Sequence, residues 1–204
     1  MSWTRSCLGA GVLMAAIALA QPPAPVVYEI RPSPQARFSL EVFKTGVMNG
    51  KKHVFLFGDY HGRLHFDRTS PANSGMELTL EAASAVCQDT WVSPKDLKKV
   101  QKQAFEMMDV TQHPQLSFSS QRIVPLGGNR FQVEGLLNIR GIAKPVTVTV
   151  TLAEQGDDTL VFSGGAEVRM QDYGLKPPSA ALGMVGTKNG MNVAFVLQAK
   201  RVGP

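Results

Sequence analysis

Cysteine is scarce in this chain of 204 residues, which contains only Cys7 and Cys87. Cys7 lies inside an apolar run near the N-terminus, so Cys87 is the only cysteine outside that run. We therefore expect no intrachain disulfide in the mature protein. Charged residues are also few, at 18%, whereas hydrophobic residues make up 44%. This composition is too apolar for a disordered chain and is sufficient for one globular domain.

No apolar run reaches the roughly 20 residues that a membrane-spanning helix needs. The longest run extends from Cys7 to Ala20, follows Arg5 and ends in the small residues Ala18-Leu19-Ala20. This pattern is typical of a signal peptide over residues 1–20, and we predict cleavage after Ala20. Residues 21–25 are rich in proline and are interpreted as an extended tether. The mature protein is therefore expected to be secreted and soluble, with one domain over residues 26–204.

The motifs of the common enzyme classes are absent as well. The sequence contains no P-loop, dinucleotide fingerprint, HExxH zinc motif or nucleophile elbow. The net charge is +5, but no nucleic-acid recognition motif accompanies it, so DNA and RNA are not expected partners. We expect a protein without catalytic residues, resident cofactor or metal. An enzyme built from residues distant in the sequence stays an alternative.

Alternation of apolar and polar residues dominates the rest of the chain. Phe38, Leu40 and Val42 alternate with polar residues, which is typical of a strand with one face in a core and one in water. The same pattern predicts strands over 27–31, 54–66 (straight or bent at Gly58), 76–86, 116–124, 131–140, 146–152, 159–170 and 191–197. Antiparallel pairing is expected, because parallel strands would need helical crossovers.

One helix interrupts this series. Ser93 is a good N-cap, Pro94 suits the first helical position, and apolar residues then recur at helical spacing as far as Asp109. So many strands with a single amphipathic helix predict an all-β domain. We expect a closed or nearly closed antiparallel barrel whose mouth the helix covers, with a β-sandwich as the alternative.

Four segments resemble the YceI-like, polyisoprenoid-binding family of secreted bacterial proteins. They are Gly58–Asp67 (GDYHGRLHFD), Phe105–Phe118 (FEMMDVTQHPQLSF), Gly135–Val146 (GLLNIRGIAKPV) and Asp172–Lys176 (DYGLK). In order and spacing they cover nearly all of the mature chain. The resemblance implies an eight-stranded, lipocalin-like barrel with an apolar cavity that holds an isoprenoid-chain lipid, and a location in the periplasm.

An eight-stranded barrel either fills its interior with side chains or holds one small ligand. Small residues on the inward face favour free volume; alternatively, they only permit bends or fill a tapering barrel. These small residues are Ala82, Gly135, Gly164, Ala166 and Ala199. The predicted wall of a lipid cavity consists of Phe38, Leu40, Leu80, Phe118, Phe162, Val193 and Phe195.

Polar residues offer further candidate sites. His113 and Tyr173 are candidates for contact with a head group at the rim. The helix carries a lysine cluster that would dock the mouth to an anionic membrane surface, or would simply be its solvated face. This cluster consists of Lys95, Lys98, Lys99 and Lys102. His61 and His65 share a strand face with carboxylates, but Arg63 between them opposes a cation, so this face is interpreted as polar exterior. Cys87 is expected to be a buried small side chain, with a reactive or intermolecular thiol as the alternative.

The sequence thus predicts a periplasmic binding protein that takes a polyprenyl or quinone-like lipid, for lipid carriage, sequestration or stress tolerance. Two alternatives are a secreted enzyme that acts on an apolar substrate in the same cavity, and an interaction protein whose barrel is solidly packed.

Overall fold

A computed structural model describes residues 25–154 and 158–203 of the chain. The predicted signal peptide and all of the tether except Pro25 lie outside the described residues. The strands are β1 (Val26–Ile30), β2 (Arg37–Gly46), β3 (Lys52–Phe57), β4 (Tyr60–Phe66), β5 (Gly75–Glu81), β6 (Ala85–Cys87), β7 (Gln115–Gly127), β8 (Arg130–Ile139), β9 (Ile142–Glu154), β10 (Thr159–Arg169) and β11 (Val185–Arg201). The helices are α1 (Pro94–Met108) and four short 3-10 turns, η1 (Pro71–Asn73), η2 (Ala82–Ser84), η3 (Met170–Tyr173) and η4 (Ala181–Gly183).

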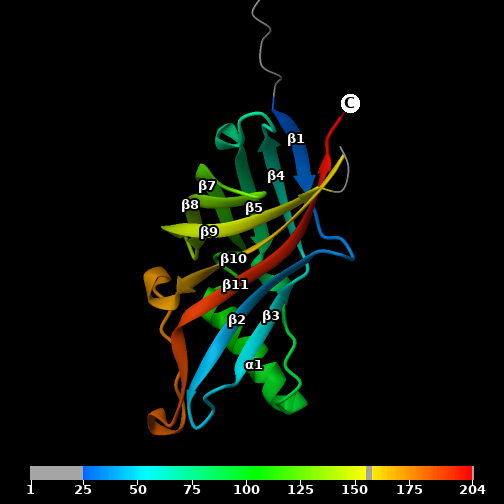
Figure 1. Cartoon of the computed structure of the whole chain (residues 1–204). Coiled ribbons are helices and arrows are strands. Elements are labelled where there is room, and N and C mark those ends of the chain that lie inside the picture. The colour runs from blue at the N-terminus through cyan, green and yellow to red at the C-terminus, as the bar shows by residue number, and fades with distance from the viewer. Residues whose placement is uncertain (1–24, 155–157, 204) are drawn as a thin grey trace, which may run out of the picture.

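The strands form one antiparallel sheet that closes on itself (Figure 1). The ring runs β1-β4-β5-β7-β8-β9-β10-β11, and β1 closes it by pairing with β11 as well as with β4. The predicted eight-stranded barrel is therefore confirmed. Beyond the ring, β2, β3 and β6 extend the sheet from β11. The long strand β11 pairs with both β1 and β2 on the same edge, because β1 pairs with its C-terminal part and β2 with the part before it.

Alternation places one face of each strand in the core. In β4 the side chains of Tyr60, Leu64 and Phe66 are buried, whereas His61 and His65 are exposed. The face that carries the two histidines is thus the exterior of the barrel, as its charge pattern predicts. Side chains are also deeply buried where β1, β10 and β11 meet. Those with at most 1% exposure there are Tyr28, Ile30, Leu160, Leu197 and Ala199.

Two predicted strands are each divided in the structure. The segment 54–66 breaks at Gly58, so that β3 and β4 are separate strands. The segment 76–86 breaks at the 3-10 turn η2, after which β6 leaves β5 and pairs with β3. Apolar residues continue through the second break, at Ala82-Ala83 and Ala85-Val86-Cys87, so the apolar pattern alone could not show where the strand changes its neighbour.

The helix α1 has the predicted ends. The Ser93 hydroxyl accepts a hydrogen bond from the backbone N–H of Asp96 at 3.1 Å, and Asp109 ends the helix in the left-handed conformation, with φ of 50°. No residue of α1 is fully buried, but Val100, Ala104 and Met107 pack against the barrel core. The helix therefore covers part of the barrel with one apolar stripe. Figure 1 shows the helix at the end of the molecule where β2 and β3 lie.

The hairpin turns that connect β7 to β8 and β8 to β9 contain residues of positive φ. Gly127, Gly128 and Asn129 have φ of 82°, 59° and 59° between β7 and β8. Arg140 and Gly141, at 54° and 74°, join β8 to β9 in the same way. Two successive residues of positive φ match the twist of a hairpin, and glycine adopts this conformation without strain. The turn predicted around Gln155 lies largely outside the described residues.

Candidate functional site

The barrel and α1 enclose an apolar cavity of about 180 Å³. Its lining comes from β2, β3, β5 to β11, α1, and the segment between β10 and β11 that begins with η3. One water molecule needs roughly 15 Å³ on the same kind of measure, so this space is far larger than a packing defect. Among the described residues, the lining is apolar except for Lys44, His53, Gln103 and Thr187, and includes neither aspartate nor glutamate. Gln103 on α1 is also exposed to solvent, so the cavity reaches the surface beside the helix.

Six of the seven predicted wall residues line this cavity. They are Phe38, Leu40, Leu80, Phe118, Val193 and Phe195. Phe162 instead lines a neighbouring pocket of about 60 Å³. The ring of Phe195 stacks on Phe38 at 5.9 Å and meets Phe162 edge-on at 6.4 Å, so it stands between the two spaces. That the wall residues contact a ligand stays a prediction.

The small inward residues have two different roles. Ala166 lines the cavity, whereas the other four do not. A Cβ on Gly135 would lie 2.6 Å from the Phe118 ring, and one on Gly164 would lie 2.8 Å from the Phe195 ring. These two glycines therefore let aromatic side chains lie flat against the strands. Ala166, like Ala85 and Ala104, is a small residue of the lining and leaves volume there.

A polar belt crosses the inner face at one end of the cavity. It consists of Thr187, Lys44 and His53, which lie on β11, β2 and β3. Thr187 pairs directly with Lys44, and His53 pairs with Val42, two residues from Lys44 on the same strand face. The Lys44 ammonium donates to the Thr187 hydroxyl at 3.4 Å. Burial lowers the pKa of Lys44, because the charged form loses hydration.

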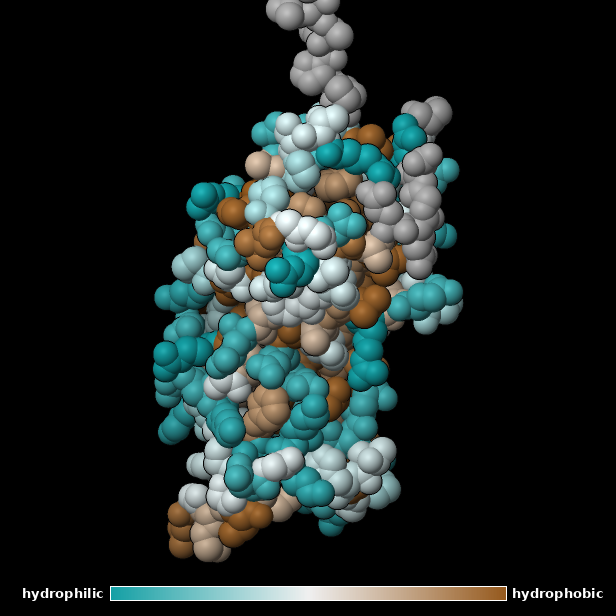
Figure 2. All heavy atoms as spheres, viewed as in Figure 1, coloured by the Kyte–Doolittle hydropathy of each residue, from teal (hydrophilic) through white to brown (hydrophobic). Residues whose placement is uncertain are grey.

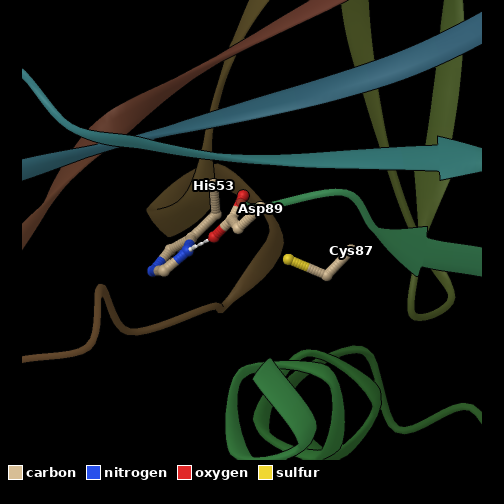
Figure 3. A group of neighbouring side chains, drawn as sticks. All are labelled: His53, Cys87 and Asp89. Carbon is tan, nitrogen blue, oxygen red and sulfur yellow. Dashed lines mark hydrogen bonds and ion pairs between the residues drawn. The ribbon is translucent and has the colours of Figure 1, made fainter. Parts of the chain in front are cut away.

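A carboxylate holds His53 in place from behind the belt (Figure 3). Nδ1 of His53 lies 2.5 Å from the Asp89 carboxylate, whose other oxygen accepts from the Val54 backbone N–H at 3.0 Å. The side chains of His53 and Asp89 are 12% and 1% exposed. The ring of Trp91 stacks on the imidazole with centroids 5.3 Å apart. These contacts leave Nε2 as the imidazole nitrogen that is free to bind a ligand.

Cys87 is buried beside this pair, as predicted. Burial raises the pKa of its thiol to about 11, and the charge of Asp89 adds to that effect. The thiol is therefore protonated near neutral pH and is a poor nucleophile.

Among the described residues, one group of three or more metal-ligating side chains has its donor atoms close together. It comprises His53, Cys87 and Asp89, with donor atoms within 4.8 Å of one another. A divalent cation would need the thiol deprotonated and the His53–Asp89 hydrogen bond broken. The hydrogen bonds of the three groups account for their arrangement without an ion.

The structure places the two predicted rim residues away from the cavity. Tyr173, in η3, is 1% exposed and belongs to the hydrophobic core. His113 follows α1 and packs near Gly141, where a Cβ would lie 3.4 Å from the imidazole. Neither residue lines the cavity. Met170, Leu175 and Pro178, on either side of Tyr173, do line the cavity, so this segment reaches it although the Tyr173 side chain does not.

The lysine cluster of α1 is exposed to solvent, opposite the stripe that faces the cavity. Lys99 pairs with Asp96 at 2.9 Å and Lys102 with Glu106 at 3.6 Å. Among the described residues, Lys95 and Lys98 form no ion pair. The cluster is therefore placed where it could meet a charged surface, but two of its four charges are partly neutralised.

Lys44 and His53 are the site residues that sequence reasoning missed. The signal was their phase: Lys44 continues the inward series of Phe38, Leu40 and Val42, and His53 is in phase with Phe55. A lysine or histidine at an inward position of a predicted strand indicates a polar group inside the barrel. No described helix is long and apolar enough to cross a membrane.

The chain matches a family model described as "YceI-like domain" over residues 28–199. A UPF0312 protein of Azotobacter vinelandii is 27% identical over 125 residues, which are 59% of this chain and 62% of that protein. A UPF0312 protein of Pseudomonas aeruginosa is 30% identical over 125 residues, with the same coverage of 59% and 62%. The matched part is thus less than two thirds of the length of these relatives.

Solved structures share the fold. BcnA of Burkholderia cenocepacia gives a TM-score of 0.67 at 24% identity, covering 81% of this chain and 97% of BcnA. A domain from Saccharophagus degradans described as a polyisoprenoid binding domain gives 0.61 at 9% identity, covering 85% and 98%. At these identities the structures establish the barrel architecture.

Proposed function

The chain belongs to the family of YceI-like domains, and from that premise and the cavity we propose that it carries a single isoprenoid-chain lipid. The observation that supports this most directly is the enclosed apolar lining with one polar end. An apolar pocket with a few converging polar groups is the usual form of a small-molecule site. The polyisoprenoid binding domain of Saccharophagus degradans, which has the same fold, supports the same ligand class.

A linear chain fits the arrangement of the two internal spaces. The cavity and the smaller pocket share the wall residues Met76, Val133 and Val150. A chain that fills the cavity from its polar end would extend past Phe195 toward the smaller pocket. Both linings contain phenylalanine and methionine side chains besides branched valine, leucine and isoleucine, so the available length depends on rotamers such as those of Phe195 and Met76.

The competitor for such a ligand is the membrane rather than water. At about 0.8 kcal/mol per buried CH₂, transfer of a long prenyl chain from water would exceed the practical limit on affinity of about 18–21 kcal/mol. Transfer from a bilayer into an apolar cavity nearly cancels this contribution. Selectivity must then come from the shape of the cavity and from the polar groups that meet the head group.

Access to the bilayer would be provided by an apolar tip that lies near the polar belt. The tip consists of Val47, Leu182 and Met184, which are 75%, 107% and 62% exposed. The Val47 N–H donates to the Met184 carbonyl at 3.0 Å, so the two loops are held together. Figure 2 shows brown, hydrophobic atoms at the bottom of the molecule. In Figure 1 the end of β2 and the turn before β11 lie at the same place.

The charges around the tip suit an anionic surface. Residues 44–53 and 174–190 contain no acidic residue. Of their five lysines, Lys44 lines the cavity and Lys52 pairs with Glu41, whereas Lys51, Lys176 and Lys188 form no ion pair among the described residues. Each lysine near such a surface contributes up to about 1 kcal/mol, and each inserted apolar side chain roughly 1.5–3 kcal/mol. The lysine cluster of α1 would add to this attraction. We therefore propose transient docking of the tip on an anionic bilayer.

Vesicle sedimentation tests this docking. The protein should sediment with vesicles of phosphatidylglycerol and phosphatidylcholine and remain in the supernatant with phosphatidylcholine alone. The double variant Leu182→Asp/Met184→Asp should lose at least tenfold in binding, whereas Leu126→Asp on an exposed site of β7 should not. Lys98→Glu/Lys99→Glu tests the helix separately. Equal sedimentation of all variants would overturn the docking proposal.

The carrier proposal implies binding rather than catalysis, in the periplasm. It is supported by the protonated state of the Cys87 thiol and by the predicted signal peptide. An enzyme that uses the same cavity would instead show turnover of an apolar substrate that depends on His53, the histidine that lines it.

Native mass spectrometry of protein purified from its own periplasm without detergent is the decisive experiment. We expect a stoichiometric adduct that, after organic extraction, fragments as an isoprenoid. Protein that is empty and also fails to take up prenyl lipids offered in vitro would overturn the carrier proposal and favour a solidly packed interaction protein.

A further inference from the structure

The helix α1 closes a gap that the sheet leaves in the wall of the cavity. β6 pairs with β3 on one edge and stands at the end of the strand order. Toward its other edge β7 begins only at Gln115, which pairs with Glu81 of β5, so among the described residues no strand continues the wall beside β6. α1 lies there instead, and five of its residues line the cavity.

One side chain joins α1 to the backbone of β6. The Gln101 amide oxygen accepts from the Cys87 N–H at 2.8 Å, and the Gln101 NH₂ group donates to the Ala85 carbonyl at 2.7 Å. These two backbone groups face the same edge of β6, so Gln101 takes the place of a neighbouring strand. Among the described residues, the other side-chain hydrogen bonds and ion pairs of α1 stay within the helix or reach its N-cap, Ser93.

The remaining attachment of α1 is its apolar stripe, which is only partly buried. No residue of the helix is fully buried, although Val100, Ala104 and Met107 pack against the core. The strands β10 and β11, in contrast, contain fully buried residues such as Leu160 and Ala199 and are joined by a ladder of backbone pairs. Segments with little burial and few bonds to their surroundings open at a lower free energy than the core. α1 should therefore separate from the cavity more readily than these strands.

The chain on both sides of α1 is anchored to the barrel. Before the helix, Nε1 of Trp91 donates to the Lys52 carbonyl of β3 at 3.0 Å. After the helix, the Ala82 N–H donates to the Pro114 carbonyl at 2.8 Å. α1 lies between these two anchors and ends at Asp109, so a rotation in the short connections would move the helix while the anchors stay in place.

We propose that α1 is a lid on the cavity, that Gln101 is its latch, and that the ligand passes between α1 and β6 while the latch is open. This inference rests on the proposed function, since the lid controls the entry of the lipid that the cavity carries. Gln103 both lines the cavity and is exposed, so the closed structure already reaches the surface beside the helix. In the open state water would replace Gln101 at the backbone groups of Ala85 and Cys87.

Amide hydrogen exchange of the ligand-free protein tests the lid without any lipid. The amides of α1 should exchange together, roughly tenfold or more faster than those of β10 and β11 after correction for intrinsic rates, and with a weaker dependence on urea. Gln101→Met should accelerate exchange along the whole of α1 by roughly tenfold, because two hydrogen bonds that hold the closed state are lost. Gln88→Met is the matched control, since Gln88 donates to the Val86 carbonyl of the same strand and does not bond to α1.

Binding kinetics connect the opening to the ligand. Stopped-flow fluorescence of Trp91, whose ring stacks on the cavity residue His53, follows the uptake and release of geranylgeraniol. Gln101→Met should raise the association and dissociation rates together, each by roughly tenfold, and leave Kd within about threefold, because the latch is closed in both the empty and the filled protein. If Gln101→Met fails to fold by circular dichroism, Gln101→Glu, which keeps the acceptor and loses the donor, takes its place.

The outcomes separate the lid from the carrier proposal. If α1 exchanges only through global unfolding, at the same rate as β10 and β11, the lid is refuted and the carrier proposal is unaffected. A Gln101→Met variant that changes the dissociation rate alone would also refute the lid, because Gln101 would then only stabilise the filled protein. Failure of the wild-type protein to bind geranylgeraniol would count against the carrier proposal and would remove the role of the opening, even with α1 exchanging as expected.

Discussion

Replacement of Ala166 by phenylalanine tests whether the cavity is the ligand site. Ala166 lies on β10, pairs with Val193 of β11 and is a small residue of the cavity lining. A cavity of about 150 Å³ accommodates a benzene molecule, so a phenyl group at position 166 should take up much of the 180 Å³ present. The variant removes ligand volume without introducing charge.

The unliganded variant should remain stable, because the new ring enters free space. Overpacking of a filled core costs about 1–3 kcal/mol, and we expect less than about 1.5 kcal/mol here. Ligand binding, in contrast, should stabilise only the wild-type protein. At a ligand concentration of 100 times Kd the gain is about 2.7 kcal/mol, which corresponds to roughly 5–11 °C in Tm for a domain of this size.

Differential scanning fluorimetry with and without geranylgeranyl phosphate measures both effects. The matched control is Ala194→Phe, at an exposed position of β11 next to the outward face of β10. It should retain the ligand-induced shift, and Ala166→Phe should lose it. If Ala166→Phe shows the full shift, or if it unfolds as an overpacked core would, the space is not the ligand site that we infer.

Three further predictions concern stability and reactivity. Gly164→Ala should lower the free energy of unfolding by about 1–3 kcal/mol, because the new Cβ would lie 2.3 Å from a carbonyl oxygen of β9. Gly75→Ala, whose Cβ would lie 4.0 Å from its nearest neighbour, should be nearly neutral, and urea unfolding compares the two variants. The pKa of the Cys87 thiol is raised to about 11, so Cys87 should resist iodoacetamide at pH 8 until the protein is denatured, and rapid labelling of the native protein would contradict this. The contribution of the thiol to stability should be lost as the pH rises from about 9 to 11, because the unfolded state releases the proton first. Asp89→Ala should cost about 1–3 kcal/mol, because the Val54 N–H loses its buried acceptor, and an unchanged urea midpoint would show that water replaces it.

The strands and the helix could be predicted because their signals are local. Ser93, Pro94 and Asp109 mark the ends of α1, and period-two alternation marks nearly every strand. What alternation cannot show is which strand pairs with which. The closure of the ring depends on β1 pairing with β11, whose residues are far apart in the sequence, and the break at η2 sends β6 to a different neighbour.

The same limit explains which site residues were found. Wall residues such as Leu80 and Val193 need only the correct face of a strand, and alternation supplies that face. Rim residues also need a side chain that points to the opening, and Tyr173, in η3, instead packs in the hydrophobic core.

The polar belt combines both requirements, because Lys44 and His53 become neighbours only through the register of β2 and β3. Each breaks the apolar phase of its own strand, which was visible in the sequence. A charged residue on the inward phase carries a cost in hydration, so where such a residue is found it indicates a function for that end of the barrel. In a barrel whose lining is otherwise apolar, the inward lysine therefore indicates the polar group of the ligand, which the apolar residues around its chain do not indicate.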